Sequence, residues 1–151
     1  PPRSTLFPYT TLFRSGTVLH DVASASGLSG VPVVSDDGSF IAFRHSTYVR
    51  ESQTKVVEQV VVTVQSLDGR TKLELTENYV PVSVLNDGST VVMANRWSGH
   101  GVAPVLWVSK DGKTVKELVK AVSASVIGES VIYATNDDKP AIKTASLPNR
   151  E

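Results

Sequence analysis

The sequence lacks cysteine, long apolar runs, an excess of charge of one sign and regular helical periodicity, and each absence excludes a class of protein. Without cysteine there are no disulfides and no thiolate metal sites, although this does not distinguish cytoplasm from periplasm. No apolar run reaches the about 18 residues that a membrane-spanning helix needs. The formal net charge is zero, so the chain lacks the basic field that nucleic-acid binding requires. We therefore expect no membrane span and no nucleic-acid partner.

We expect the first 15 residues to differ in origin from the rest. Residues 1–15 are identical to the translation of one reading frame of a standard short-read sequencing primer, and so resemble a translated sequencing adapter. We expect this segment to be an artefact that makes no organised contribution to the fold, and the native chain to start near Gly16 inside a longer gene. Residues 16–151 suffice for one domain, and without Arg3 and Arg14 their net charge is −2.

Short apolar runs separated by turn signals predict an all-β fold. Valine, a strong strand former, occurs 25 times. The expected strands are Thr17–Val22, Val31–Ser35, Phe40–His45, Val56–Ser66, Lys72–Thr76, Val80–Val84, Thr90–Asn95, Pro104–Ser109, Val115–Val119, Ala124–Ile127, Val131–Thr135 and Ala141–Ser146. Asp-Gly pairs at Asp37, Asp68, Asp87 and Asp111 separate four pairs of these strands, and they suit tight hairpins because glycine adopts positive φ freely.

One segment, Val115–Val122, is ambiguous. Its apolar residues, which include Leu118 and Val119, have the spacing of a helical turn. We favour a strand because the equivalent segment Thr71–Thr76 looks extended.

An internal repeat reveals the organisation of the chain. Val31–Phe43 resembles Val80–Met93 if one residue is inserted before the second Asp-Gly, which places the two Asp-Gly glycines 50 residues apart. Ser125–Tyr133 is a weaker third copy, with its Gly128 a further 40 residues along. Four strands in each period of 40 to 50 residues is typical of a β-propeller blade.

The repeat resembles a known family. Ser35–Phe43 is similar to the S-P-D-G-x-x-I-A-F core of the TolB-type propeller repeat, and Val62–Thr76 resembles the later half of that repeat. Such WD-like blades also form the propeller domains of prolyl oligopeptidase and tricorn-type peptidases. The sequence departs from the pattern at Asp36, where proline is usual, and at Met93, where an aromatic residue is usual. The resemblance implies a propeller fold, but blades of this kind serve both binding proteins and enzymes.

The resemblance implies a partial β-propeller of about three four-stranded antiparallel blades. Their expected bounds are about residues 31–77, 80–119 and 123–147, and Thr17–Val22 would be the last strand of a truncated blade. A propeller needs at least about four blades to close, so the first and last blades should have apolar faces without a neighbour.

The expected core lies where the first two blades pack face to face. We expect Ile41 and Phe43 of the first blade to lie between these blades, together with Val91 and Met93 of the second. The glycines of the two aligned Asp-Gly turns should occupy equivalent positions of positive φ.

The candidate binding residues are Tyr48, Arg50, Arg96, Trp97 and His100. They belong to the two longest loops, expected at residues 45–53 and 96–101, which join the second and third strands of the first two blades. In a propeller these loops share one edge, and tyrosine, tryptophan and arginine are favoured interface anchors. The alternative is that they are ordinary loop residues, with Trp97 packing as a lid on its blade.

No pattern in the sequence predicts catalysis or a metal. Ser98 lacks both the G-x-S-x-G pattern and the strand-to-helix context of a nucleophile elbow. The three histidines are far apart, with no H-x-x-x-H spacing. Neither Asp36–Gly38 nor Asn136–Asp138 has the alternating ligands of a calcium loop, and turn formation explains both. We expect no catalytic residue, no metal and no cofactor.

Two hypotheses about function remain open. The first is a non-catalytic binding platform of TolB type, with a protein or peptide partner. The second is the propeller of a prolyl oligopeptidase-type serine peptidase, which would control substrate access to a catalytic domain absent from this chain. A cell-surface or periplasmic lyase or sensor propeller is a third possibility without a residue in its favour. The family resemblance implies a periplasmic or extracellular location.

Overall fold

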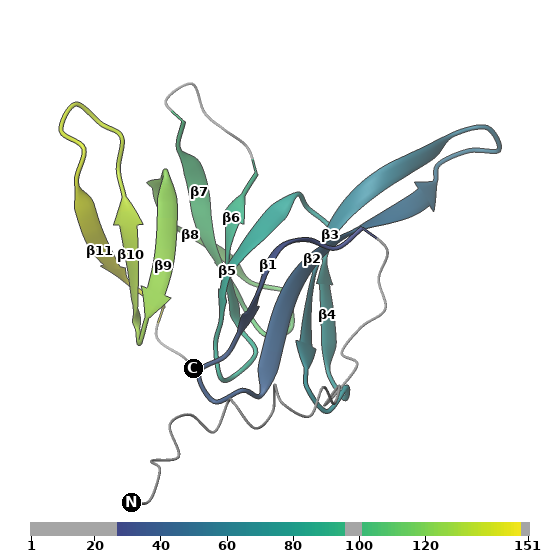
Figure 1. Cartoon of the computed structure of the whole chain (residues 1–151), viewed down its shortest axis with the longest axis horizontal. Coiled ribbons are helices and arrows are strands. Elements are labelled where there is room, and N and C mark those ends of the chain that lie inside the picture. Colours follow the sequence, from purple (N-terminus) through teal and green to yellow (C-terminus); the bar gives the residue numbers. More distant parts are fainter. Residues whose placement is uncertain (1–26, 96–100, 149–151) are drawn as a thin grey trace, which may run out of the picture.

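The computed structural model describes residues 27–95 and 101–148, which form strands and turns but no helix (Figure 1). This part of the chain accordingly has no helix that could cross a membrane. The strands are β1 (Ser29–Val34), β2 (Phe40–Arg50), β3 (Val56–Ser66), β4 (Lys72–Leu75), β5 (Tyr79–Val84), β6 (Thr90–Ala94), β7 (Ala103–Val108), β8 (Val115–Ala121), β9 (Ser123–Ile127), β10 (Ser130–Ala134) and β11 (Ile142–Ser146). The all-β class expected from the sequence is confirmed, while the strand expected at Thr17–Val22 lies outside the described residues.

The strands form three antiparallel meanders that follow one another along the chain. The first sheet has the order β1-β2-β3-β4, the second β5-β6-β7-β8 and the third β9-β10-β11. The chain passes from the last strand of one sheet to the first strand of the next through residues 76–78 and through Val122 alone. The first strands lie side by side, because β5 contacts both β1 and β9. This is the arrangement of consecutive propeller blades, and none of the three sheets closes on itself.

The second sheet is buried on both faces because it contributes to two hydrophobic cores. The core shared with the first sheet consists of Ala42, Val62, Val64, Leu75, Tyr79, Val84, Val92, Ala94 and Val108. The core shared with the third sheet consists of Leu85, Val91, Val105, Ala121, Val131 and Leu147. We call the face of a sheet that is turned toward the next sheet along the chain its leading face, and the opposite face its trailing face.

The expectation about which residues lie between the first two sheets is wrong. Ala42 and Val92 lie there. Val91 and Met93 are turned the other way and pack against the third sheet. Ile41 alternates with Ala42 along β2 and therefore lies on the trailing face of the first sheet, as does Phe43.

The lengths of two turns explain this difference. The turns Ser35–Phe40 and Leu85–Ser89 are each closed by an N–H of the first residue that donates to the carbonyl of the last, at 2.9 and 2.8 Å. The second turn is therefore one residue shorter after its glycine. Because side chains alternate between faces, a change of one residue reverses the face of the strand that follows. Ala42 is thus equivalent to Val91 rather than to Val92, and both lie on leading faces.

The repeated Val-Pro pairs also have a structural role. Pro32 and Pro81 lie in β1 and β5, each of which has an irregular register next to the proline. Both strands are at the edge of their sheets. Proline is accepted there because an edge strand and a bulge can each do without one N–H donor.

The ambiguous segment at Val115 is a strand, as favoured. β8 pairs with β7 so that Val119 lies opposite Val105 and Glu117 lies opposite Leu106, which leaves Leu118 as an extra residue. This bulge places Leu118 and Val119 against the same core. The helix-like spacing of apolar residues is therefore the spacing of a bulged strand.

The loop expected at residues 45–53 is instead mostly strand. β2 and β3 pair without interruption as far as Arg50 opposite Val56, well beyond the ends of β1 and β4. β-branched residues on both strands favour this extension. The tip is closed by the Glu51 N–H, which donates to the Lys55 carbonyl at 3.0 Å, and by an ion pair between the two side chains. We call this two-stranded extension, residues 45–61, the hairpin arm; it projects from the sheets at the upper right of Figure 1.

Candidate functional site

The molecule has two distinct edges. The short turns within the sheets gather at one of them, where a single groove of about 530 Å³ is lined by residues of three turns, among them Arg70, Gly88 and Lys110. We call this the turn edge. The tip of the hairpin arm and the β10–β11 connection lie at the opposite edge, at the top of Figure 1, which we call the loop edge.

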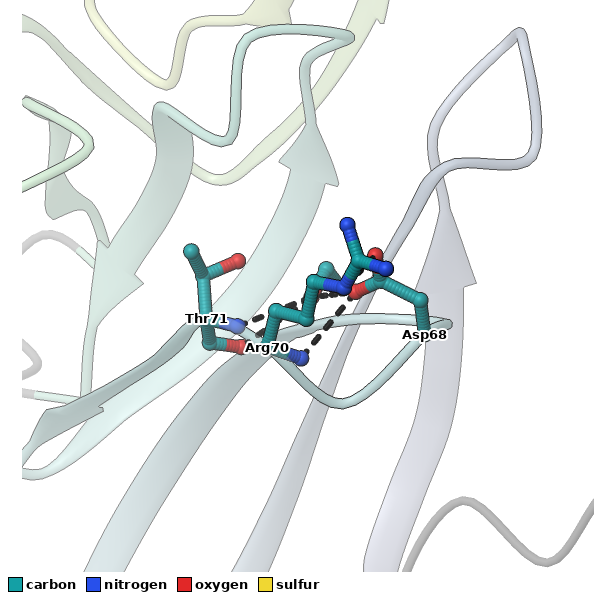
Figure 2. Close-up of polar contacts among 4 residues, drawn as sticks. Asp68, Arg70 and Thr71 are labelled. Carbon is teal, nitrogen blue, oxygen red and sulfur yellow. Dashed lines mark hydrogen bonds and ion pairs between the residues drawn. The ribbon is translucent and has the colours of Figure 1, made fainter.

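The turn edge is held by a repeated set of hydrogen bonds, shown for one turn in Figure 2. Ser66 Oγ donates to Asp68 Oδ1 at 2.7 Å and accepts the N–H of Thr71 at 3.0 Å. Asp68 Oδ1 also accepts the N–H of Arg70 at 3.0 Å. The same three bonds recur in the turns that begin at Ser35 and Ser109. The fourth turn has Leu85 in place of the serine, so the pattern S-x-D-G marks three of the four Asp-Gly turns.

These bonds account for the electrostatics of the turn edge. The pKa of the aspartate in each of the three turns is held below its usual range, chiefly by a serine hydroxyl that donates to the carboxylate. The donors are Ser39 for Asp37, Ser66 for Asp68 and Ser109 for Asp111. Lowered pKa values at this edge therefore reflect the folding of turns and not the tuning of a catalytic group.

The hairpin arm places two of the five candidate binding residues at the loop edge. Tyr48 and Arg50 lie in β2, opposite Glu58 and Val56 of β3, and the Tyr48 side chain is 67% exposed. Side chains two residues apart point to the same face of a strand. Because the register is unbroken from Ala42 onward, both residues continue the leading face, which is turned toward the second sheet.

Arg96, Trp97 and His100 lie outside the described residues, but the residue before them is placed. The Asn78 side-chain oxygen accepts hydrogen bonds from Arg44 Nη2 at 3.1 Å and from Asn95 Nδ2 at 3.3 Å. The Asn95 N–H also donates to the Asn78 carbonyl at 2.8 Å. The base of the hairpin arm and the end of β6 are therefore joined through one asparagine between β4 and β5.

Sequence reasoning missed a second feature of the loop edge. A cleft of about 450 Å³ lies between the second and third sheets, lined by Val102, Lys120 and residues 135–138. Within it, the pKa of Asp137 is lowered chiefly by a hydrogen bond from the Thr135 side chain. Residues 136–138 were interpreted only as a turn, because nothing in their sequence indicates that Lys120 lies across from them.

The described residues contain no group of three or more side chains suited to hold a metal ion. His45, at the base of the arm, contacts the Phe43 ring and has its Nε2 at 2.9 Å from Thr63 Oγ1. Its contacts are those of a residue packed on a sheet. At the exposed arm, the described residues offer one aromatic side chain, Tyr48, and one cationic side chain, Arg50.

Comparisons with protein-family models, with curated proteins and with solved structures find no match to this chain.

Proposed function

We propose that the chain is a non-catalytic binding platform of propeller type, and that a protein or peptide partner binds at its loop edge. The supporting observation is the pair of hydrogen bonds at Asn78, because they fix the base of the hairpin arm beside the end of β6. Arg96 directly follows Asn95 in the sequence. Tyr48 and Arg50 extend from the same side of the arm, so the five candidate residues come from two neighbouring connections.

The chemistry of these residues indicates the kind of partner. Tyrosine and tryptophan offer large rigid surfaces that lose little conformational entropy on binding, and arginine forms bidentate bonds with carboxylates. Val56, which lies opposite Arg50, adds exposed apolar area to the same face of the arm. The expected partner is a segment that carries carboxylates beside an apolar side chain. The turn edge, by contrast, is occupied by short turns whose polar groups bond to one another.

The alternative role, as the access-controlling propeller of a serine peptidase, has no observation in its favour within this chain. The complete gene would distinguish the two, since a downstream segment with G-x-S-x-G in an α/β-hydrolase context would indicate the peptidase.

Selection from a displayed random peptide library on the immobilised chain tests the proposal. Enriched peptides should be acidic with an apolar anchor. Trp97→Ala should weaken their binding by about 2 kcal/mol or more, as expected for an interface anchor, and Arg50→Ala should weaken it measurably. Arg70→Ala is the control, because Arg70 is also an exposed arginine but lies in a turn at the opposite edge.

Two results would overturn the proposal. One is a set of enriched peptides whose binding is insensitive to Tyr48→Ala, Arg50→Ala and Trp97→Ala. The other is hydrolase or transferase turnover by the purified chain.

A further inference from the structure

The outer edge of β3 has no partner strand along the hairpin arm. β4 pairs with β3 only from Val62 to Gln65, so residues 56–61 have β2 on one side and, among the described residues, no strand on the other. Apart from the pairing with β2, no main-chain hydrogen bond joins residues 56–61 to another described segment. Because the arm projects from the sheets (Figure 1), this edge extends away from both cores.

The hydrogen-bond pattern shows which main-chain groups face that edge. The Ser66 N–H donates to the Thr71 carbonyl, on the side of β3 that is turned away from β2. Residues of an antiparallel strand direct their N–H and C=O groups alternately to the two sides, and the register of β3 with β2 has no break. An N–H and a C=O are therefore directed outward at each of Val56, Glu58 and Val60.

Several other edge strands carry features that oppose pairing with a further strand. β1 and β5 each contain a proline and an irregular register, and β4, β8 and β11 carry Lys72, Lys116 and Lys143. Proline, lysine and bulges are the usual means of blunting a sheet edge. Residues 56–61 contain neither proline nor lysine, and their β-branched valines favour the extended conformation. This edge is therefore suited to accept another strand.

The charge at the centre of the edge indicates which strand it accepts. Glu58 is exposed and forms no ion pair with another described residue. Two copies of the chain that paired antiparallel along the whole edge would place Glu58 opposite its own counterpart, and like charges directly opposite each other destabilise a sheet. A lysine or arginine in that position forms a favourable cross-strand pair instead. The edge therefore favours a partner segment with a basic residue over a second copy.

We propose that an extended segment of the partner adds to the outer edge of β3 as an antiparallel strand, with a basic residue opposite Glu58. The inference rests on the proposed function only in that the partner meets the hairpin arm. Strand addition takes its affinity from main-chain hydrogen bonds and its specificity from alternate side chains. Here those side chains lie on the face that carries Tyr48 and Arg50. A carboxylate opposite Val56 lies two strands, about 10 Å, from Arg50, within the combined reach of the two side chains.

Fluorescence anisotropy with a labelled peptide tests the inference on the full chain. The probe is Thr-Val-Thr-Lys-Thr-Glu-Thr, capped at both ends, whose valine, lysine and glutamate would lie opposite Val60, Glu58 and Val56. In that register the lysine N–H donates to β3, while the N–H groups of the flanking threonines point away. N-methylation of the lysine amide should weaken binding about tenfold or more. N-methylation of the threonine before it is the matched control and should leave binding nearly unchanged.

A charge exchange tests the register. Glu58→Lys should weaken binding about threefold or more, and a probe with glutamate in place of its lysine should recover it. Glu117→Lys, the same change at an exposed position of β8, should have no effect. Strand addition is overturned by a probe that does not bind, by equal effects of the two N-methylations, by a Glu58→Lys loss that the exchanged probe does not recover, or by self-association of the chain that the probe reverses. If Trp97→Ala alone weakens binding, the loop-edge partner stands without strand addition, and the reverse result removes the role of Trp97.

Discussion

Two glycines in equivalent turns should respond very differently to the same substitution. Gly38 and Gly88 both have positive φ, at 72° and 85°, so alanine at either position incurs the left-handed cost of about 1–2 kcal/mol. The surroundings differ. A Cβ at Gly38 would meet no atom within 4 Å, whereas a Cβ at Gly88 would lie 2.9 Å from Cε1 of Phe40 on the first sheet.

The clash sets the expected magnitude. Overpacking of this kind adds about 1–3 kcal/mol when the neighbour must shift. Gly38→Ala should therefore lower the free energy of unfolding by about 1–2 kcal/mol, and Gly88→Ala by about 2–5 kcal/mol. Urea denaturation followed by far-UV circular dichroism measures both. In a Phe40→Leu background, which removes Cε1 and Cζ, Gly88→Ala should lower the free energy of unfolding by less than it does in the original chain.

A second pair of turns supplies an independent comparison. A Cβ at Gly112 would lie 2.8 Å from Leu73 Cδ1, while one at Gly69 would meet nothing within 4 Å. Gly112→Ala should cost more than Gly69→Ala, though by a smaller margin, because a leucine methyl at the end of a flexible side chain can move aside. Equal losses within both pairs would refute the reasoning, since backbone strain alone would then explain the data.

Three further predictions concern stability. Ser66→Ala should lower the free energy of unfolding by about 1 kcal/mol and raise the pKa of Asp68 toward its usual value, measured by urea denaturation and by NMR titration of the carboxyl carbon. The pKa values of the three turn aspartates are lowered in the folded state. Their stabilising contribution is therefore complete above the ordinary aspartate pKa and is lost as the pH falls through the lowered values. The urea midpoint of unfolding should drop on acidification, and it should drop less in Ser66→Ala. Deleting residues 1–15 should change the free energy of unfolding by less than about 1 kcal/mol, as a thermal or urea melt of the shortened chain would show.

The positions of the strands could be predicted from the sequence, but the face of each strand that is buried could not. Period-two apolar runs and Asp-Gly turns locate the three sheets, because both signals are local. Which face of β2 or β6 is buried depends on whether the preceding turn has three or four residues between its closing pair. Asp-Gly-Ser is common to both turns, but Leu85 stands where the first turn has Ser35. The three turns that begin with serine close five residues on, where the serine hydroxyl accepts the N–H, whereas the turn that begins with Leu85 closes four residues on.

The candidate site was predictable only in part. Residues 45–53 were expected to form a loop, but residues 45–50 belong to β2, because the pairing with β3 that extends this strand depends on residues 56–61 and has no local signal. The roles of Asn78 and Lys120 could not be anticipated, because each depends on contacts with residues distant in the chain. By contrast, S-x-D-G is a local pattern, and the serine could have been identified from the spacing alone.

The contribution of the second sheet to both cores determines the order in which the sheets should unfold locally. In a linear array each unit depends on its neighbours, so the first or third sheet can open with the loss of one core, whereas the second cannot open without losing both. Fluctuations should therefore begin at the flanks and reach Val91 and Val92 last. A protease acting on the native chain would trim it from the outside inward, and the amide hydrogens of β6 would be the slowest to exchange with solvent.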